Sequence, residues 1–197
     1  MDIRYTKTHL HPQIKTFLFQ HFAIFTSIFR SVLGLLEIDY IGVALLNQYD
    51  EFLLFSSKPS IEWNLIENDL WQFDHSYHSS FFDQHEAKIW GELYHEPWRD
   101  ELYYFKQKVP GLNFGFSIPS NYQNSQIVYS FATKSTRHHD IQKIIENPAE
   151  CIRIGQFCLQ KILNAIILPD LFNTAIQNKS FLKLIINNEP PKLSKHL

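Results

Sequence analysis

Two runs of alternating apolar residues, joined by a polar loop, constrain this chain more than any other stretch. Residues 113–134 read NFGFSIPSNYQNSQIVYSFATK. Every second position is large or β-branched, namely Phe114, Phe116, Ile118, Ile127, Tyr129, Phe131 and Thr133. A period of two is typical of a half-buried β-strand, and residues 119–125 between the runs are rich in turn-forming types. The stretch therefore predicts a β-hairpin.

The opposite face of this hairpin carries little bulk. Its side chains include Gly115, Ser117, Ser130 and Ala132, which are all small. Small residues on a sheet leave space above it, and that space is filled either by a packed helix or by a ligand. The pattern leaves both interpretations open.

A second hairpin and several helices complete the predicted fold. We expect strands over 40–46 and 51–57, and helices over 12–33, 60–70, 97–108, 137–146 and 149–167. Residues 71–96 are expected to form an irregular excursion dense in aromatic side chains. Hairpins between amphipathic helices favour an α+β fold, in which an antiparallel sheet is flanked by helices as an α-β-α sandwich. This layout resembles the PAS and GAF families.

Composition and charge narrow the classes of function. The formal net charge is −2 and the pI is about 6.5, so the chain has no general attraction for nucleic acid or anionic membranes. The N-terminus lacks a signal-peptide core, and no apolar run reaches the roughly 18 residues that span a bilayer. Cys151 and Cys158 lie too far apart on one predicted helix for a disulfide. Free thiols suit the cytoplasm, which is the expected location.

The chain is expected to divide into a mobile N-terminus over 1–11, one domain over 12–168, and a helix and tail over 169–197. The segment 170–187 has helical apolar spacing, at Leu171, Ala175, Ile176, Leu182, Ile185 and Ile186. This segment comes after both hairpins in the chain, and the preceding helices already cover most of the two faces of the sheet. Burying each such side chain is worth roughly 1.5–3 kcal/mol. We therefore expect the C-terminal helices to pair in a homodimer.

Four motifs, taken together in their order, carry a resemblance. They are LEIDYIGVALL, KPSIEWNLIENDLWQFDHSYH, the tryptophan at position 90, and PGLNFGFSIPSNYQNSQIVYSFATK. The first and last are similar to strands, and the second to a tryptophan- and aspartate-bearing stretch, of the autoinducer-binding domains of LuxR-type transcriptional regulators. The resemblance covers about residues 12–167. It implies a sensor of small amphipathic molecules.

The resemblance also implies a binding site. In that family, tryptophan and aspartate side chains hold an acyl-homoserine lactone. Trp63 would donate to the lactone carbonyl, Asp74 would accept from the amide N–H, and Trp90 would close the head-group side. Gly115 would match the glycine on the pocket strand. We therefore expect Trp63, Asp74 and Trp90 to lie in one cavity-lining cluster beside Gly115.

The sequence departs from the family pattern at one pocket position. The family tyrosine that follows the tryptophan falls on Glu67 here. A tyrosine hydroxyl can donate to a carbonyl, whereas an ionised glutamate cannot. Tyr77 or Trp71 would have to compensate, and Ser130 would line the site from the small face of the sheet.

Members of that family continue into a helix-turn-helix domain that binds DNA. Residues 168–197 are too few to form one, and they contain no arginine. Pro190 and Pro191 lie where such a domain would begin. The chain is therefore either cut from a regulator or a protein that kept only the sensor, and no DNA contact is expected from this chain alone.

Enzymatic interpretations have weaker support. A metal could bind to the set Asp74, His75, His78, Asp83 and His85, but the spacing matches no known ligand frame. A nucleophilic cysteine paired with His138 or His139 would lie in the middle of a helix, where thiols are normally inert. No glycine-rich phosphate loop or GxSxG motif occurs. We expect no enzyme activity, no metal and no cofactor.

Two functions remain open. The first is a ligand-sensing module of LuxR type, acting in transcriptional or signalling regulation such as quorum sensing. The second is a non-enzymatic interaction protein that uses the same scaffold without a ligand. The first predicts an enclosed pocket between the sheet and residues 63–90. The second predicts that Trp63, Trp71 or phenylalanine side chains fill that space.

Overall fold

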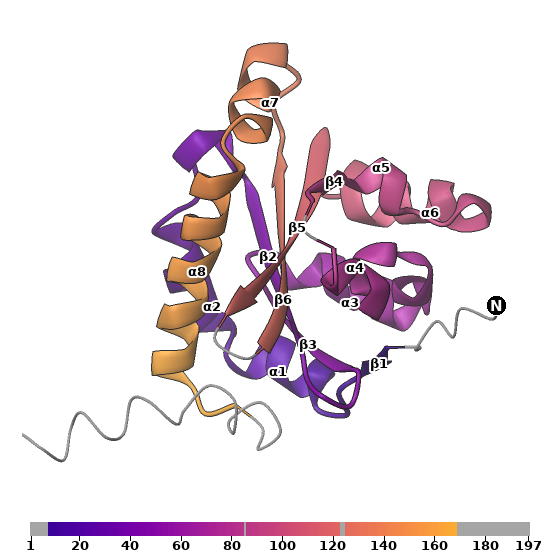
Figure 1. Ribbon diagram of the computed structural model, residues 1–197, viewed down its shortest axis with the longest axis vertical. Helices are drawn as coiled ribbons and strands as arrows, with labels where there is room; N and C mark the ends of the chain where they lie inside the picture. Colours follow the sequence, from indigo (N-terminus) through magenta and orange to yellow (C-terminus); the bar gives the residue numbers. More distant parts are fainter. Residues whose placement is uncertain (1–7, 85, 123–124, 169–197) are drawn as a thin grey trace, which may run out of the picture.

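A six-stranded sheet forms the centre of the molecule (Figure 1). The computed structural model describes residues 8–84, 86–122 and 125–168. The strands are β1 His9–Leu10, β2 Tyr40–Leu46, β3 Glu51–Ser56, β4 Lys88–Ile89, β5 Phe114–Tyr122 and β6 Ser125–Thr133. Their order is β1-β3-β2-β6-β5-β4, and only the β1–β3 pair is parallel. The α+β fold predicted from the two hairpins is confirmed.

The two predicted hairpins lie side by side in this sheet, joined by the ladder between β2 and β6. In that ladder, Gly42 of β2 lies opposite Ser130 of β6. In the ladder between β6 and β5, Ser130 lies opposite Ser117, and Ala132 lies opposite Gly115. Directly opposed residues of antiparallel strands project to the same face. These five residues therefore form one surface, which we call the small-residue face.

Residues 8–11 correct the expectation of a mobile N-terminus over 1–11, because they belong to the fold. His9 pairs in parallel with Glu51 of β3. The hydroxyl of Thr8 is buried and donates to the backbone oxygen of Tyr77 at 2.6 Å. This short strand covers the edge of β3, which would otherwise present unpaired backbone groups to solvent.

Helices α2 (Phe22–Arg30) and α8 (Pro148–Ala165) pack together on the face opposite the small residues (Figure 1). The predicted helix over 149–167 is confirmed as α8. The single helix predicted over 12–33 is wrong, because His21 has non-helical backbone angles (φ −106°, ψ 18°) and separates α1 (Ile14–Gln20) from α2. The break lets α1 pack against β3 and α3 while α2 packs against α8.

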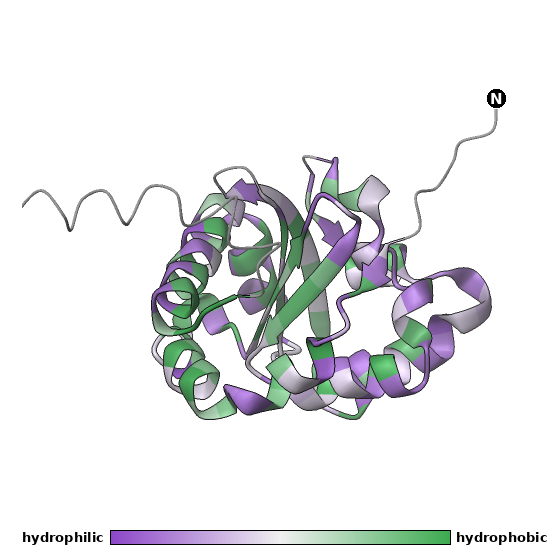
Figure 2. Cartoon of the chain, turned by 90° about the horizontal axis from the view of Figure 1, so that it is seen from below, coloured by the Kyte–Doolittle hydropathy of each residue, from purple (hydrophilic) through white to green (hydrophobic). Residues whose placement is uncertain are grey.

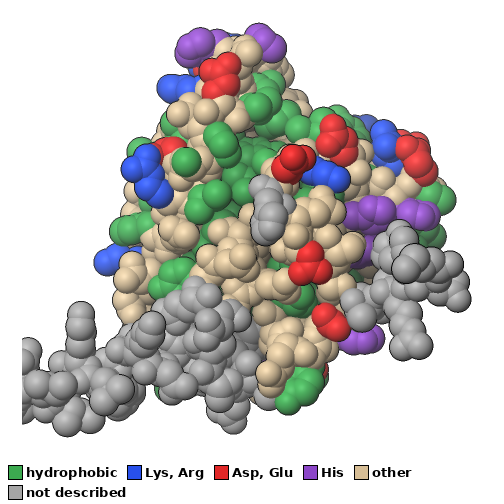
Figure 3. Space-filling model, viewed as in Figure 1, with side chains coloured by type: hydrophobic (Ala, Val, Ile, Leu, Met, Phe, Trp, Pro, Cys, Tyr) green, Lys and Arg blue, Asp and Glu red, His purple; other side chains and the backbone are tan. Residues whose placement is uncertain are grey.

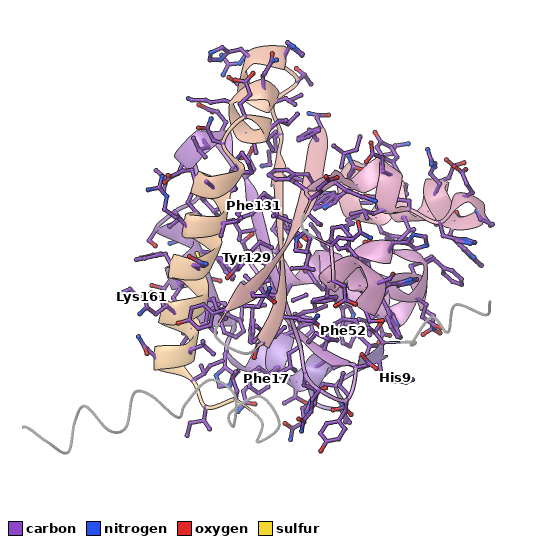
Figure 4. The ribbon with its side chains drawn as sticks, in the orientation of Figure 1. His9, Phe17, Phe52, Tyr129, Phe131 and Lys161 are labelled. Carbon is purple, nitrogen blue, oxygen red and sulfur yellow. The ribbon has the colours of Figure 1, made fainter. Side chains whose placement is uncertain are left out.

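The core beneath α8 explains one glycine of that helix. Tyr129 and Phe131 of β6 lie between the sheet and α8 (Figure 4). A Cβ atom on Gly155 would lie 2.5 Å from Cδ1 of Tyr129, so glycine allows the helix to approach the ring closely. The apolar stripe of α8 is buried in its own chain, and segment 170–187 lies outside the described residues. The homodimer contact stays a prediction.

Short helices cover the small-residue face and replace the irregular excursion expected over 71–96. Figure 2 shows apolar residues along the strands and on the inner sides of the helices that cover the two faces of the sheet. The remaining elements are η1 Leu35–Glu37, α3 Pro59–Glu67, η2 Leu70–Phe73, η3 His75–Tyr77, α4 Ser79–Phe82, α5 Trp90–Leu93, η4 Glu96–Trp98, α6 Arg99–Tyr103, the π-helical turn η5 Tyr104–Lys108, and α7 His138–Ile145. None of the helices within the described ranges is long and apolar enough to cross a membrane.

Candidate functional site

The small-residue face is occupied by an indole of the chain itself. Strand β4 pairs with the edge of β5 and leads directly into α5, so that Trp90, its first residue, lies over β5. Trp90 is fully buried, and its indole N–H donates to the hydroxyl of Ser117 at 3.1 Å. The hydroxyls of Ser117 and Ser130 are 2.7 Å apart. A Cβ atom on Gly115 would lie 2.3 Å from Cε3 of Trp90, so this position must be glycine for the indole to fit.

Asp74 lies beside this indole with no exposed surface. One carboxylate oxygen, Oδ1, accepts from the backbone N–H and the hydroxyl of Ser76, at 3.0 Å and 2.6 Å. These bonds cap the η3 turn. The other oxygen, Oδ2, accepts from the Lys106 ammonium, whose side chain is also fully buried. Both carboxylate oxygens are therefore engaged within the chain.

The ammonium of Lys106 sits among aromatic rings. Its nitrogen lies 4.3 Å from the centroid of the Trp90 ring, and 5.6 Å from those of Tyr77 and Tyr94. Aromatic faces attract cations, most strongly when both groups are removed from water. We call Asp74, Tyr77, Trp90 and Tyr94 the Lys106 cage. Burial, and next the charge of Asp74, raise the pKa of both tyrosines well above the usual value, so both remain neutral phenols.

The π-helical turn explains why a lysine points inward. Helical spacing predicts Leu102, Phe105 and Val109 on one side of the helix expected over 97–108. Leu102 is buried as this predicts, but Val109 is 55% exposed, whereas Lys106 is buried. A π-helical turn contains one extra residue, which rotates the following side chains relative to an α-helix. The neighbouring Gln107 is also buried and accepts from the hydroxyl of Tyr94 at 3.0 Å. The expected buried side of this helix is therefore wrong from Lys106 onward.

A second buried carboxyl borders the cage. Glu62 of α3 is 1% exposed, and its Oε1 accepts from the hydroxyl of Tyr40, whose ring meets that of Trp90 edge-on at 5.6 Å. On the other side of the cage, Tyr77 stacks on Phe52 at 5.2 Å, and Phe52 meets the ring of Trp71 at 5.5 Å. The Lys106 cage is thus connected through these rings to Glu62 on one side and to Trp71 on the other.

Two polar atoms in these side chains lack a partner. Oε2 of Glu62 and the indole N–H of Trp71 are buried, and neither has a hydrogen bond within residues 8–84, 86–122 and 125–168. Buried polar groups in proteins are almost always paired, and leaving one unpaired costs about 1–3 kcal/mol. Within the described residues, these two atoms therefore keep hydrogen-bonding capacity that the chain does not use.

The environment of Glu62 predicts a pH dependence. Burial raises the pKa of its carboxyl above 4.5, opposed by the hydrogen bond from Tyr40. The folded state then holds this proton more tightly than the unfolded state, so the stabilisation is complete below pH 4.5 and is lost as the pH rises through the raised pKa. Glu62→Gln keeps an acceptor for Tyr40 but cannot ionise. We expect its free energy of unfolding, relative to the natural protein, to increase with pH in urea titrations begun at pH 4.5.

The matched control is Glu67→Gln, because Glu67 is partly exposed and paired with Lys15 at the surface. This variant should track the natural protein without a rising difference. Parallel pH profiles for Glu62→Gln and the natural protein would contradict the assignment of a raised pKa to Glu62.

The structure brings together most of the site residues expected from the sequence. Asp74, Tyr77 and Trp90 belong to the Lys106 cage, and Gly115 lies directly under the indole of Trp90. Ser130 joins through Ser117, and Trp71 through Phe52.

Trp63 is the exception. It is only partly buried, and its ring contacts Phe19 of α1 at 5.1 Å, with the Lys15 ammonium 4.9 Å above it. Trp63 thus packs at the junction of α1 and α3, and its expected place in the cluster with Asp74 and Trp90 is corrected. The neighbouring Glu62 takes the inward position because successive helical residues point about 100° apart. The sequence signal for the burial of Glu62 is its position between Ile61 and Leu65, two apolar residues on the buried side of the helix.

The residues considered for metal binding or nucleophilic catalysis have other environments, apart from His85, which lies outside the described residues. Figure 3 shows histidine side chains gathered on the side of the molecule that bears α5 and α6. The ring centroids of His75 and His78 lie 4.7 Å apart. Among the residues described, no group of three or more histidine, cysteine or acidic side chains is arranged to hold a metal ion. Burial raises the pKa of Cys151 to about 11 and that of Cys158 to about 12, so both thiols stay protonated near neutral pH.

Comparison of the sequence with family models and with curated proteins gives no match. Solved structures share the fold. One is CepR2 from Burkholderia cenocepacia, described as an N-acylhomoserine lactone dependent LuxR family transcription factor, with a TM-score of 0.50 and 12% identity over 64% of this chain and 78% of that one. Another is SdiA in complex with octanoyl-rac-glycerol, with a TM-score of 0.53 and 15% identity over 85% of this chain and 70% of that one. The chain has the fold of LuxR-type autoinducer-binding domains, as the four motifs predicted.

Proposed function

We propose that this chain is a non-enzymatic, ligand-sensing regulatory domain, which binds a small amphipathic molecule on the small-residue side of its sheet. The observation that carries the proposal is the pair of buried, unpartnered polar atoms, Oε2 of Glu62 and Nε1 of Trp71, on either side of the Lys106 cage. A bound molecule that supplies an acceptor to the indole N–H and a polar group to the carboxyl would satisfy both.

The surroundings of these atoms support an amphipathic ligand. Phe52, Tyr40 and Tyr77 supply buried aromatic surface next to them. Ligand sites typically combine such apolar walls with a few placed polar groups. The two solved structures of similar fold are described with an acyl-homoserine lactone dependence and with octanoyl-glycerol. Both molecules join an acyl chain to a neutral polar head, and we propose the same class here.

Each site residue predicted from the sequence, except Trp63, keeps a role in this proposal. Trp71 donates to the ligand. Trp90 and Tyr77 form the wall, and Gly115 and Ser130 form the floor that admits Trp90. Asp74 does not contact the ligand, because both of its carboxylate oxygens already accept hydrogen bonds within the chain. It stabilises the wall through its ion pair with Lys106. The domain is proposed to work as a homodimer in the cytoplasm, where its two buried thiols stay reduced.

One observation favours the second candidate, a protein-interaction domain that needs no ligand. Lys106 already fills the position beside Asp74 that the resemblance gives to a ligand N–H. If side chains or water supply the missing hydrogen-bond partners of Glu62 and Trp71, the domain needs no ligand to satisfy its buried polar groups. The two candidates differ in whether a molecule copurifies with the protein.

Mass spectrometry of small molecules released from the purified protein tests the proposal. We expect one amphipathic molecule at close to one per chain, or, if it is lost in purification, a rise in melting temperature on titration with N-octanoyl-homoserine lactone or octanoyl-glycerol. Protein that releases nothing and is unaffected by either compound would support the interaction domain instead.

Trp71→Phe should weaken binding of the compound that the mass spectrometry identifies or the titration selects. The change keeps the ring against Phe52 but removes the N–H donor. A hydrogen bond contributes about 0.5–1.5 kcal/mol, so the Kd in fluorescence or calorimetric titrations should rise by up to about tenfold. Trp98→Phe is the control, since Trp98 is partly exposed and stacks on Phe73. Equal Kd values for the two variants would remove Trp71 from the site.

A further inference from the structure

The Lys106 cage has the composition of a binding site for an organic ammonium ion. A carboxylate, two phenol rings and an indole surround one buried nitrogen, which Asp74 contacts directly and Trp90 faces at 4.3 Å. Aromatic rings together with a carboxylate are the groups with which proteins recognise ammonium ligands. In this chain the ammonium comes from Lys106.

The walls of the cage are held independently of Lys106. Asp74 is fixed by two hydrogen bonds from Ser76. Trp90 is fixed by Ser117 and by its fit over Gly115. Tyr94 is fixed by its hydrogen bond to Gln107. A site whose walls have their own partners should keep its shape when its occupant is shortened.

We infer that the Lys106 cage is a primary-ammonium binding site that the chain fills with its own side chain. Lys106 is then a specificity-determining residue, because it occupies Oδ2 of Asp74 and denies that oxygen to an amide N–H of any incoming ligand. The inference goes beyond the proposed function. It depends on the geometry of the cage and holds whatever molecule binds near Trp71.

Lys106→Ala, made in the full chain, tests the inference by chemical rescue. The change removes three methylene groups and the ammonium, so n-propylammonium has the missing size and charge. We expect Lys106→Ala to have a lower melting temperature than the natural protein. Propylammonium at about ten times its Kd should then raise it by about 3–6 °C. Methylammonium should act less strongly, and neutral 1-propanol at the same concentration should have no such effect.

Three comparisons make the result specific. Lys108→Ala is the matched control, because Lys108 lies in the same turn and faces the ring of Tyr104 at 5.9 Å, but at the surface. For the Lys108→Ala variant and for the natural protein, propylammonium should change the melting temperature no more than sodium chloride of equal ionic strength does. The double variant Lys106→Ala, Asp74→Asn lacks the buried carboxylate, so it should fold and lose the response.

Each outcome decides the question. Selective stabilisation of Lys106→Ala, lost in the double variant, supports the inference. Equal responses of Lys106→Ala and Lys108→Ala, or an equal effect of 1-propanol, would overturn it. If Lys106→Ala is recovered folded only when refolded with propylammonium, that also supports it. Failure to fold even then, while the double variant folds, would overturn it. Because these readouts need no amphipathic ligand, they are separate from the test of the proposed function.

Discussion

Replacing Lys106 with methionine should lower the free energy of unfolding by about 3–5 kcal/mol. Methionine has nearly the length of lysine but no charge, so the change leaves the carboxylate of Asp74 buried without its counter-ion. Removing one partner of a buried ion pair is costly for this reason, whereas the pair as a whole contributes little. Urea denaturation followed by tryptophan fluorescence would measure the loss.

A second substitution separates the charge from the packing. Asp74→Asn combined with Lys106→Met should recover most of the lost stability, because asparagine can still accept from Ser76 and carries no charge. Lys15→Met is the surface control. Lys15 pairs with Glu67, and both side chains are about half exposed, so its loss should cost at most about 1 kcal/mol. A Lys106→Met variant as stable as Lys15→Met would show that the buried pair is not as described.

Gly115→Ala should be the other strongly destabilising change, at about 1–3 kcal/mol and toward the upper end of that range. The added methyl would lie 2.3 Å from the indole of Trp90. That ring cannot move freely, because it is fully buried, bonded to Ser117 and covered by Lys106. Thermal denaturation should therefore show a lower melting temperature.

Gly91→Ala is the natural control for this prediction. Gly91 follows Trp90 in the same helix, and nothing lies within 4 Å of the position of its added Cβ. Alanine is favoured over glycine in a helix by roughly 0.5–1 kcal/mol, so this change should be neutral or slightly stabilising. Equal losses in both variants would point to a general sensitivity of α5 and not to the contact between Gly115 and Trp90.

The sheet was predictable because its signal is local. Alternation with a period of two marks the hairpin over 113–134, and the strand expected over 40–46 coincides with β2. The break at His21 carries no such signal, since the apolar spacing continues through it, and only the packing of α1 against β3 requires the turn. The same limit applies to β1, whose two residues become a strand only because an edge of β3 is available.

The candidate site was predictable in part, and the missed residues include both charged ones, Lys106 and Glu62, and the neutral Tyr94. Trp90 and Gly115 could be placed together because the order of the four motifs resembles that of autoinducer-binding domains, whereas the small face alone left its occupant open. Lys106 could not be found, since periodicity assigns a lysine to solvent, and the π-helical turn that directs it inward has no sequence signature here. Trp63 was misplaced because a motif fixes a residue's position in a helix less well than it fixes the helix itself.

The central ladder of the sheet has a consequence for how the chain is made. Tyr40 of β2 pairs with Ala132 of β6, and every residue between them must be synthesised before that pairing forms. At about 5–20 residues per second, those roughly 90 residues take on the order of 5–20 s. During that interval the β2–β3 hairpin has an unpaired apolar edge, and partners this distant in sequence also slow folding in the released chain. The nascent hairpin is therefore the stage at which this protein most needs protection from aggregation.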